Sequence, residues 1–298
     1  MESGLSAEAA PKSSLWAYLR TPRFIKALLL GQLLALCITG SNTSTTKLAQ
    51  EYNINAPTMQ SCLNYILLAL AYNGWMLGKH GGRHWLAMLR DRGWKYIILG
   101  VVDVEANYFV VKAYQYTSLT SAMLLDSWAI PCCMILSYFM LRRRYRWLQY
   151  LGVLLCLAGA GLLFKSDMEA DHDYAARDAL RGDLYCILGA TLYGISNVLE
   201  EKLATTYEIT EVIGMLGLVG AITSGIQLSV LERNELATMT WSGPVIGYLV
   251  MFDLCMFCLY SCVPLLFRLS SATFFNMSLL TSDFYSLIVS LLMFNAKV

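Results

Sequence analysis

The sequence carries few charged residues for its length. Of its 298 residues, 14% are charged and 57% are hydrophobic, whereas a soluble domain has roughly a quarter charged residues. Long apolar runs recur along the chain, and the charges gather between them. This pattern predicts an all-α polytopic membrane protein. The basic residues lie in short loops, so we expect no basic patch that would bind nucleic acid.

The chain also lacks the motifs of the common enzyme classes. It contains no Walker loop, no HExxH, no GxSxG and no soluble Cys/His cluster, so we expect neither an enzyme nor a cofactor. The nine cysteines all lie in apolar runs and none lies in a loop, which argues against a disulfide framework. Cys255-Met-Phe-Cys258 has metal-ligand spacing but no second pair, and therefore indicates packing between helices and no metal site.

Nine apolar runs are each long enough to cross a bilayer, which requires about 20 residues. They are 24–44, 57–77, 95–115, 118–141, 147–165, 182–203, 210–231, 244–266 and 271–294. The first twenty residues contain no apolar core, so we expect 1–23 to be a flexible cytosolic tail and no signal peptide. An acidic loop, 166–181, separates the fifth run from the sixth.

The loops between the runs alternate in charge. Basic residues cluster before the first run, after the second and, at 142–146, after the fourth. The positive-inside rule then places the N-terminus in the cytosol and the acidic loop on the other side. We expect the plasma membrane or a Golgi or endosomal membrane, and the composition does not choose between them.

A short phrase occurs twice in the chain. SNTSTTKLA at 41–49 and SNVLEEKLA at 196–204 share Ser, Asn, Lys, Leu and Ala in the same places, 155 residues apart. LTSA at 119–122 and LSSA at 269–272 match at an offset of 150, which also aligns Asp103 with Asp253. Because five spans separate the copies, the second copy enters the membrane in the opposite orientation, as in alternating-access carriers. The repeats expected are 24–165 and 182–298.

This repeat predicts a partner for the fifth span near residue 295, yet the sequence stops at Val298. We therefore expect the second repeat to hold four helices of five, and the chain nine of ten. Such a shortened form would have an alternative role to transport. It would regulate or pair with a full-length carrier, or act as a membrane scaffold.

Ionisable residues inside the spans are functional candidates, because each costs about 2.5–3.5 kcal/mol at a helix centre on insertion scales. In the third span Glu105 and Lys112 are seven apart and share one helical face with Tyr108, which predicts a solute-binding stripe. Asp103 and Asn107, four apart, form a second polar line on another face. A packing network between helices is the alternative interpretation of either line.

Further polar residues complete the candidate site. Asp126 and Glu105 are the candidate proton carriers. The remaining candidate solute contacts lie on three spans: Asn42 on the first, Tyr193 and Asn197 on one face of the sixth, and Asn276 on the ninth. Two more aspartates are expected in secondary polar or structural roles, Asp253 and Asp283. Glu200 and Glu201 lie near the cytosolic end of their span, where we expect both to be solvated.

Three stretches of the sequence resemble a known family. They are DVEANYFVVKAYQYTSLTSAMLLD (103–126), GDLYCILGATLYGISNVLEE (182–201), and CMFCLYS with SSAT (255–261 and 270–273). They are similar to subfamily F of solute carrier family 35, over residues 24 to 290 or so. The resemblance implies the drug/metabolite transporter fold, with ten helices in two inverted five-helix repeats around a central cavity.

The same resemblance implies a function. It predicts secondary transport of a small organic solute by alternating access, and a nucleotide-, nucleoside- or nucleobase-like metabolite is the expected class. The expected partners are that solute and the lipid bilayer, and pairing of two copies of the chain stays an open alternative.

Overall fold

The fold is described from a computed structural model of the chain, which describes residues 20–52, 54, 56–113, 116, 125–145, 147–169 and 179–294. Within these residues every regular element is a helix, and no strand occurs. The all-helical class predicted from the apolar runs is thereby confirmed for this part of the chain. Residues 1–19 of the expected tail, 170–178 of the acidic loop and the LTSA stretch lie outside the described residues.

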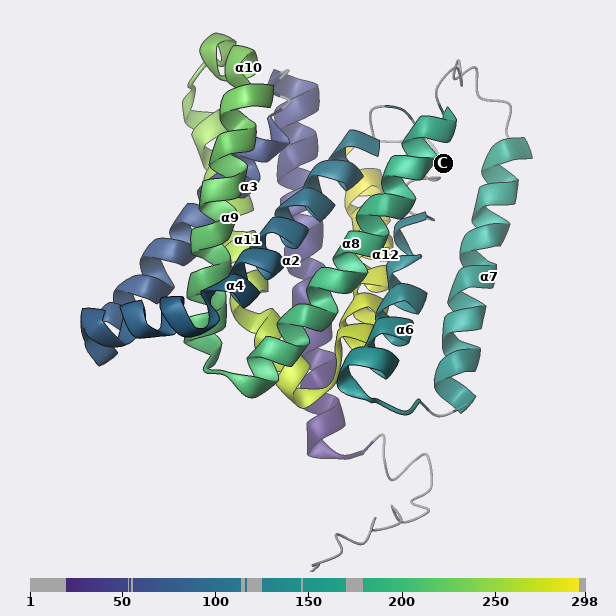
Figure 1. The fold of residues 1–298 in the computed structure, drawn as a ribbon. Coiled ribbons are helices and arrows are strands. Elements are labelled where there is room, and N and C mark those ends of the chain that lie inside the picture. The colour runs from purple at the N-terminus through teal and green to yellow at the C-terminus, as the bar shows by residue number, and fades with distance from the viewer. Residues whose placement is uncertain are drawn as a thin grey trace, which may run out of the picture.

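Figure 1 shows the order of the helices. They are α2 (Pro22–Tyr52), α3 (Pro57–Leu68), the π-helix η1 (Ala69–Asn73), α4 (Gly74–Ala113), α6 (Ala129–Leu141), α7 (Trp147–Glu169), α8 (Ala179–Thr206), α9 (Ile209–Leu231), α10 (Arg233–Thr238), α11 (Gly243–Leu269) and α12 (Ala272–Phe294). The predicted spans 210–231 and 271–294 agree with α9 and α12 to within one residue at each end.

The second and third predicted spans belong to one stretch of helix that turns sharply at Gly81. This residue has φ 76° and ψ 161° inside α4, a conformation that glycine adopts without a steric penalty. One limb therefore runs from α3 through η1 to residue 80, and the other returns over 82–113 (Figure 1). Asn73 of η1 donates a hydrogen bond to the carbonyl oxygen of Gly214 at 2.7 Å, which fixes the first limb to α9.

The bundle has two ends, named here after residues found at each (Figure 1). At the Arg143 end, α2 and α12 begin and α6, α8 and α11 finish. At the Glu232 end, α3, α8 and α11 begin and α2, α4 and α9 finish. The packed pairs α4 with α8, α11 with α2 and α3 with α9 therefore run in opposite directions, whereas α2 with α12 and α6 with α8 run in the same direction.

Inside the bundle α4 packs along α8, α11 packs along α2, and α3 packs on α9. The contact between α3 and α9 is close because glycines line it. An added Cβ at Gly217 would lie 2.6 Å from the Ala69 nitrogen, and one at Gly220 would lie 2.5 Å from Cδ1 of Tyr65. Tyr65 is therefore held tightly in the middle of the bundle.

The outer surface of the bundle is apolar. Large aliphatic side chains such as Leu29, Leu70 and Leu154 are 65%, 71% and 66% exposed, the pattern of helices that face lipid. Among the described residues, three helical stretches are long and apolar enough to cross a membrane: Pro22–Ala49, Ile209–Leu231 and Gly243–Leu269. Together these features identify an integral membrane protein.

Candidate functional site

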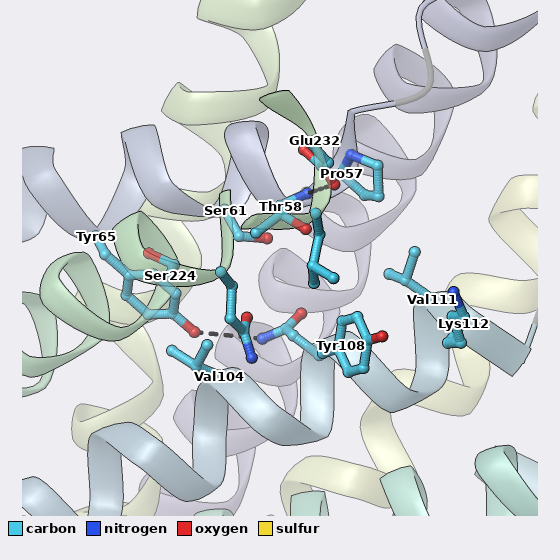
Figure 2. A pocket seen from close by; sticks show the side chains of 13 residues that line it. Pro57, Thr58, Ser61, Tyr65, Val104, Tyr108, Val111, Lys112, Ser224 and Glu232 are labelled. Atoms are coloured by element: carbon cyan, nitrogen blue, oxygen red, sulfur yellow. Dashed lines mark hydrogen bonds between the residues drawn. The ribbon is translucent and has the colours of Figure 1, made fainter. Parts of the chain in front are cut away.

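A cavity of about 210 Å³ lies inside the Glu232 end, between α3, α4 and α9 (Figure 2). α3 contributes the hydroxyls of Thr58, Ser61 and Tyr65, and α9 contributes Ser224 and Gln227. From α4 come an amide, a phenol and an ammonium group: Asn107, Tyr108 and Lys112. The lining thus combines polar groups with apolar side chains such as Val104 and Val111, and the charges of Lys112 and Glu232 balance.

The stripe predicted on the third span is divided by the structure. Tyr108 and Lys112, one turn apart on α4, both line the cavity (Figure 2). Glu105 is not among the lining residues. Its Oε1 accepts a hydrogen bond of 2.9 Å from the side-chain amide of Gln227, which does line the cavity. Glu105 therefore affects the cavity indirectly, because it orients the side-chain amide of Gln227 on α9.

Asp103 is the centre of a hydrogen-bond network beneath the cavity. The side chain is buried, and its Oδ2 accepts bonds from the hydroxyls of Tyr65 at 2.6 Å and Tyr260 at 2.9 Å. Its Oδ1 accepts a bond from the hydroxyl of Ser196 at 2.9 Å. The donors come from α3, α11 and α8, so one carboxyl joins four helices.

Asn107 connects this network to the cavity. Its amide nitrogen donates to the Tyr65 hydroxyl at 3.3 Å, and its Oδ1 accepts a 2.7 Å bond from the Tyr193 hydroxyl on α8. Asn107 and Tyr65 both line the cavity. The second polar line predicted on the third span, Asp103 with Asn107, therefore lies in one network with the predicted candidate Tyr193.

The remaining predicted asparagines are separated by the structure. Asn197 of α8 is buried and donates to Oδ1 of Asn276 on α12 at 3.3 Å. The Asn276 nitrogen donates in turn to the sulfur of Cys133 at 3.2 Å. Asn42, which the repeat pairs with Asn197, is exposed on α2. Neither Asn197 nor Asn276 lines the cavity, so this pair joins α8 to α12 at some remove from it.

The other predicted aspartates lie outside the cavity lining. Asp126 is half-buried, beside Leu125, whose side chain packs with Cys186. Asp253 is half-buried on α11, and its Oδ1 has no hydrogen-bond partner among the described residues. Asp283 belongs to α12, but its side chain lies outside the described residues.

Glu232 closes the cavity where α9 ends. Its two carboxylate oxygens accept hydrogen bonds from the backbone N–H groups of Thr58 at 2.8 Å and Met59 at 3.0 Å. Figure 2 shows Glu232 beside Thr58. These groups belong to the first turn of α3, where N–H groups lack partners within the helix. The carboxylate of Glu232 is thus used to cap a helix.

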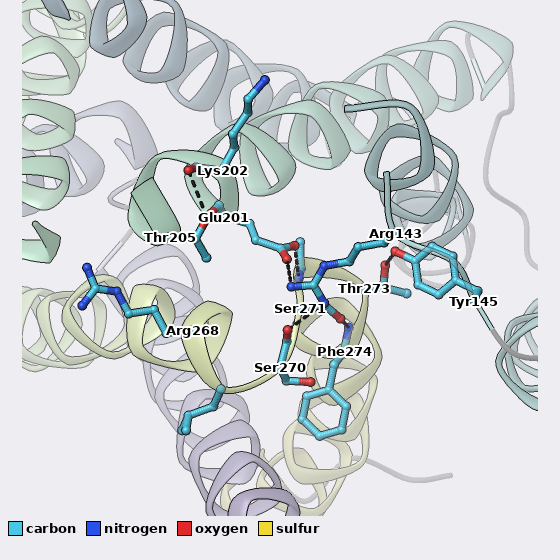
Figure 3. Close-up of polar contacts among 12 residues, drawn as sticks. Arg143, Tyr145, Glu201, Lys202, Thr205, Arg268, Ser270, Ser271, Thr273 and Phe274 are labelled. Atoms are coloured by element: carbon cyan, nitrogen blue, oxygen red, sulfur yellow. Dashed lines mark hydrogen bonds and ion pairs between the residues drawn. The ribbon is translucent and has the colours of Figure 1, made fainter. Parts of the chain in front are cut away.

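The Arg143 end is held together by ionic and backbone contacts (Figure 3). Arg143 forms an ion pair with Glu201, whose side chain is fully buried, and donates to the Ser270 carbonyl at 2.8 Å. Glu201 also accepts a 2.7 Å bond from the backbone N–H of Ala272. Arg268 donates to the Ala204 carbonyl at 2.8 Å. These bonds tie together α6, α8, α11 and α12.

The prediction that Glu200 and Glu201 are solvated is wrong. Both carboxyls are buried, with 3% and 0% of the residue exposed. α8 continues to Thr206, beyond the predicted limit of the span, so both glutamates lie more than a turn inside the helix. The start of α12 and the Arg143 side chain cover Glu201.

Outside the membrane-spanning part, one carboxyl is shifted by an ion pair. Glu208 lies in the turn between α8 and α9, and the Lys79 ammonium lies 2.9 Å from its Oε1. The hydrogen bond from Lys79 lowers the pKa of Glu208. This contact joins the first limb of α4 to the end of α8.

The Cys255-Met-Phe-Cys258 pair lies on α11 where this helix meets α2. An added Cβ at Gly40 of α2 would lie 2.7 Å from the Cys255 sulfur, so the sulfur fills a close helix contact. Both cysteines are free thiols. In the described part of the chain no group of three or more His, Cys, Asp or Glu residues could hold a metal ion.

Sequence reasoning missed Tyr65, Tyr260 and Arg143 as members of these polar clusters. A tyrosine within an apolar run was the available signal for the first two, and the basic run at 142–146 for the third. Neither signal tells which helix the side chain faces.

An apolar outer surface, helices that cross the bilayer and a polar cavity inside the bundle define a polytopic membrane protein of the solute-carrier class. The chain belongs to solute carrier family 35, because the family model SLC35F, described as solute carrier family 35, matches residues 20–298. The resemblance seen in the sequence is thereby confirmed.

Relatives with similar sequences belong to the same family. The chain is 46% identical over 291 residues to an uncharacterized solute carrier family 35 member of Schizosaccharomyces pombe. It is 44% identical over 274 residues to solute carrier family 35 member F2 of Mus musculus. The alignments cover 98% and 92% of this chain, and 57% and 73% of the relatives. The chain thus spans little more than half the length of the yeast relative.

A solved structure supports the fold. A crystal structure 18% identical in sequence matches with a TM-score of 0.69, over 92% of this chain and 90% of that one. The arrangement of helices is therefore one that occurs in a protein of distant sequence.

Proposed function

We propose that the chain moves a small organic solute across the membrane by alternating access, and that the cavity at the Glu232 end is its solute site. The observation that carries this proposal is the contrast between the two ends of one bundle. One end contains a polar cavity of about 210 Å³, and the other is tied by the buried Arg143–Glu201 ion pair. A carrier with access from one side has this asymmetry.

The packing of the helices supports two inverted repeats. If α2, α3, α4 and α6 correspond to α8, α9, α11 and α12, the contact of α4 with α8 corresponds to that of α11 with α2. The contact of α2 with α12 likewise corresponds to that of α8 with α6, and the contacts α3–α9 and α6–α12 correspond to themselves. Each of these contacts occurs in the structure. Such a pseudo-two-fold relation is typical of alternating-access carriers.

Size and charge favour a nucleobase or nucleoside within the expected solute class. Drug-sized ligands occupy pockets of about 300–1,000 Å³, so a cavity of about 210 Å³ suits a smaller molecule. Tyr65 and Tyr108 offer aromatic rings, and Asn107 and Gln227 offer amides that can pair with the polar edge of a base. Lys112 is the cation that lines the cavity. Its single positive charge is too small to balance a diphosphate group.

In this proposal the Arg143 end faces the cytosol, because Arg142, Arg143 and Arg144 lie there. The membrane is the plasma membrane or a Golgi or endosomal membrane. A second copy of the chain as a partner remains a proposal that oligomer mass in detergent would test.

The test is uptake of a panel of tritiated nucleobases and nucleosides into liposomes that contain the purified protein. Lys112→Ala removes the lining cation, and Glu105→Gln replaces the charged acceptor of the Gln227 amide with a neutral amide, which weakens the charge-assisted hydrogen bond. We expect each to abolish uptake while the reconstituted amount stays constant. Lys202→Ala is the matched control, since the Lys202 side chain is exposed and points away from the Arg143 cluster (Figure 3). Normal uptake by both cavity variants would overturn the assignment of the site.

A further inference from the structure

Two carboxyl groups lie deep inside the bundle, and neither takes part in an ion pair among the described residues. Asp103 on α4 and Glu200 on α8 are 4% and 3% exposed. Ser196, one turn before Glu200 on α8, donates a 2.9 Å hydrogen bond to Asp103, so the two carboxyls belong to one contact between α4 and α8. No arginine, lysine or histidine among the described residues forms a salt bridge with either. Two adjacent carboxylates without a cation repel each other, and each would be poorly solvated.

The hydrogen bonds around the two groups differ, and they decide which group holds a proton. Asp103 accepts bonds from the hydroxyls of Tyr65, Tyr260 and Ser196, which stabilise its ionised form. Glu200 Oε1 has no hydrogen-bond partner among the described residues. A buried carboxylate oxygen without a donor disfavours the ionised form, so the burial of Glu200 Oε1 favours the neutral acid. Asp103 is therefore the carboxylate and Glu200 the carboxylic acid.

The groups that surround the pair do not change this assignment. The arginines near α8 are engaged with other partners. Arg143, just beyond α6, pairs with Glu201, and Arg92 of α4 pairs with Glu211 of α9. Arg268 of α11 donates to the carbonyls of Ala204 and Tyr207. Of the other charged groups on α4, Glu105 accepts from Gln227, Lys95 donates to the Tyr207 hydroxyl and Lys112 lines the cavity. The side chains that bond to Asp103 or Asn107 are hydroxyl groups, namely those of Tyr65, Tyr260, Ser196 and Tyr193. Positive charge is thus directed to Glu201 and Glu211, and none reaches Glu200.

The pair is connected to the solute cavity by two hydrogen bonds. Asn107, a lining residue, donates to the Tyr65 hydroxyl, and this hydroxyl donates to Asp103. A solute that binds the Asn107 amide would alter the donor strength of Tyr65 and so the charge that Asp103 bears. On the other side Glu200 is adjacent in sequence to Glu201, which ties the Arg143 end. The pair therefore lies between the solute site and the closed end.

We propose that Asp103 and Glu200 form a proton-binding pair, which couples proton movement to transport by the carrier. The proton site follows from the pair itself, and the coupling rests on the proposed transport function. In the conformation described, the pair holds one proton on a Glu200 oxygen. When the Arg143 end opens, the O–H bond breaks and the proton leaves to that side as the Glu200 carboxylate forms. Return of a proton from either side restores the acid.

A sodium ion would be the other ligand for two carboxyls, and the geometry disfavours it. Three hydroxyls already donate to the Asp103 carboxylate and stabilise its charge without a cation. Sodium prefers a cage of oxygen atoms, as other hard cations do.

The proton is tested directly by infrared difference spectroscopy on the purified chain in lipid. We expect a C=O stretching band of a protonated carboxyl that shifts in heavy water. Glu200→Gln should remove this band. Glu201→Gln should leave it in place, because Glu201 is ionised and paired with Arg143, which makes it the matched control. A band unchanged in Glu200→Gln would overturn the proton site, whatever the transport results are.

The coupling is tested in liposomes with an interior pH dye and tritiated adenosine as the probe. We expect an imposed pH gradient to drive net accumulation by the wild type, and Glu200→Gln to lose this accumulation while it retains exchange of adenosine for adenosine. Accumulation by Glu200→Gln at the wild-type level, or a dependence on sodium in place of protons, would overturn the coupling. If the wild type exchanges no member of the nucleobase and nucleoside panel, the proposed function fails, and the infrared band still decides the proton site.

Discussion

Residues 41–49 of α2 and 196–204 of α8 are two copies of one short sequence repeat, and their surroundings in the structure differ. In α2 most of these polar side chains bond within their own helix or are exposed. Ser41 donates to a carbonyl of its own helix at 2.9 Å, Asn42 is exposed, and Lys47 pairs with Glu51 one turn on. Thr45 reaches another helix, since its hydroxyl donates to Gln60 of α3 at 2.7 Å.

In α8 the same positions reach other helices. Ser196 binds Asp103 of α4, Asn197 binds Asn276 of α12, and Glu201 binds Arg143 beyond α6. Where α2 has Thr45 and Thr46, α8 has Glu200 and Glu201. These two substitutions in the repeated segment give α8 two buried carboxyl groups that α2 lacks. Under the proposed repeat, they also make the two ends of the bundle unequal.

The largest effect is expected at Arg143. Arg143→Ala leaves the carboxylate of Glu201 buried without a cation, which should cost about 3 kcal/mol, near the low end for breaking a buried pair. The low end applies because the Arg143 side chain is 35% exposed. Thermal unfolding of the purified protein in detergent would measure the loss.

The double variant Arg143→Ala/Glu201→Thr sharpens the comparison, since it places in α8 the threonine that α2 has at position 46. With no charge left buried, most of the lost stability should return. A single variant that unfolds at the wild-type temperature would show that the ion pair does not hold this end.

The next effect compares Asp103 with Asp253, which the offset of 150 residues aligns. Asp103→Ala removes the acceptor of three hydroxyl groups and should destabilise the protein by about 2 kcal/mol. Asp253→Ala should change stability by less than about 0.5 kcal/mol, because the buried Oδ1 of Asp253 has no partner to lose. Urea-dependent unfolding of both variants would measure the two changes in the free energy of unfolding. Equal losses of stability would contradict the expected difference between Asp103 and Asp253.

A smaller effect separates Asn197 from Asn42. Asn197→Ala removes a buried hydrogen bond to Asn276 and should cost about 1 kcal/mol. Asn42→Ala changes an exposed side chain and should stay within about 0.5 kcal/mol of the wild type. Unfolding midpoints measured side by side test the pair, and a larger loss for Asn42→Ala would reverse the comparison.

The smallest effect concerns Glu208, just beyond the α8 copy. Its pKa is lowered by Lys79, so the contact stabilises the protein above the unfolded-state pKa of about 4.3. This stability disappears as the pH falls through the lower pKa of the folded state. For so exposed a pair we expect a few tenths of a kcal/mol, about 0.3. Lys79→Ala should remove this part of the acid dependence of the unfolding midpoint, and an unchanged pH profile would refute it.

The positions of the helices were largely predictable, because the length of an apolar run is set by the thickness of the bilayer. The run 210–231 and the helix Ile209–Leu231 agree for this reason. The turn at Gly81 was not predictable. Gly81 lies within a polar stretch whose sequence is typical of a loop. Only the structure shows that helix continues on both sides of Gly81.

Spacing within one helix predicted which polar residues share a face, but it did not predict their partners. Tyr108 and Lys112 line one cavity, and Asp103 and Asn107 lie in one network. The partners Tyr260 and Gln227 come from helices far along the chain. The sequence does not tell whether a phenol or an amide in an apolar run faces the lipid or the interior of the bundle. Only tertiary packing decides this.

The cap formed by Glu232 has a consequence for selectivity. The first turn of α3 would otherwise offer unpaired N–H groups and a partial positive charge to an anion in the cavity. Glu232 occupies those donors with its own carboxylate. The protein thus places its own carboxylate beside the cavity. Under the proposed function, a phosphorylated solute would meet this negative charge in place of free N–H donors, so the cap would favour an uncharged base over its phosphates.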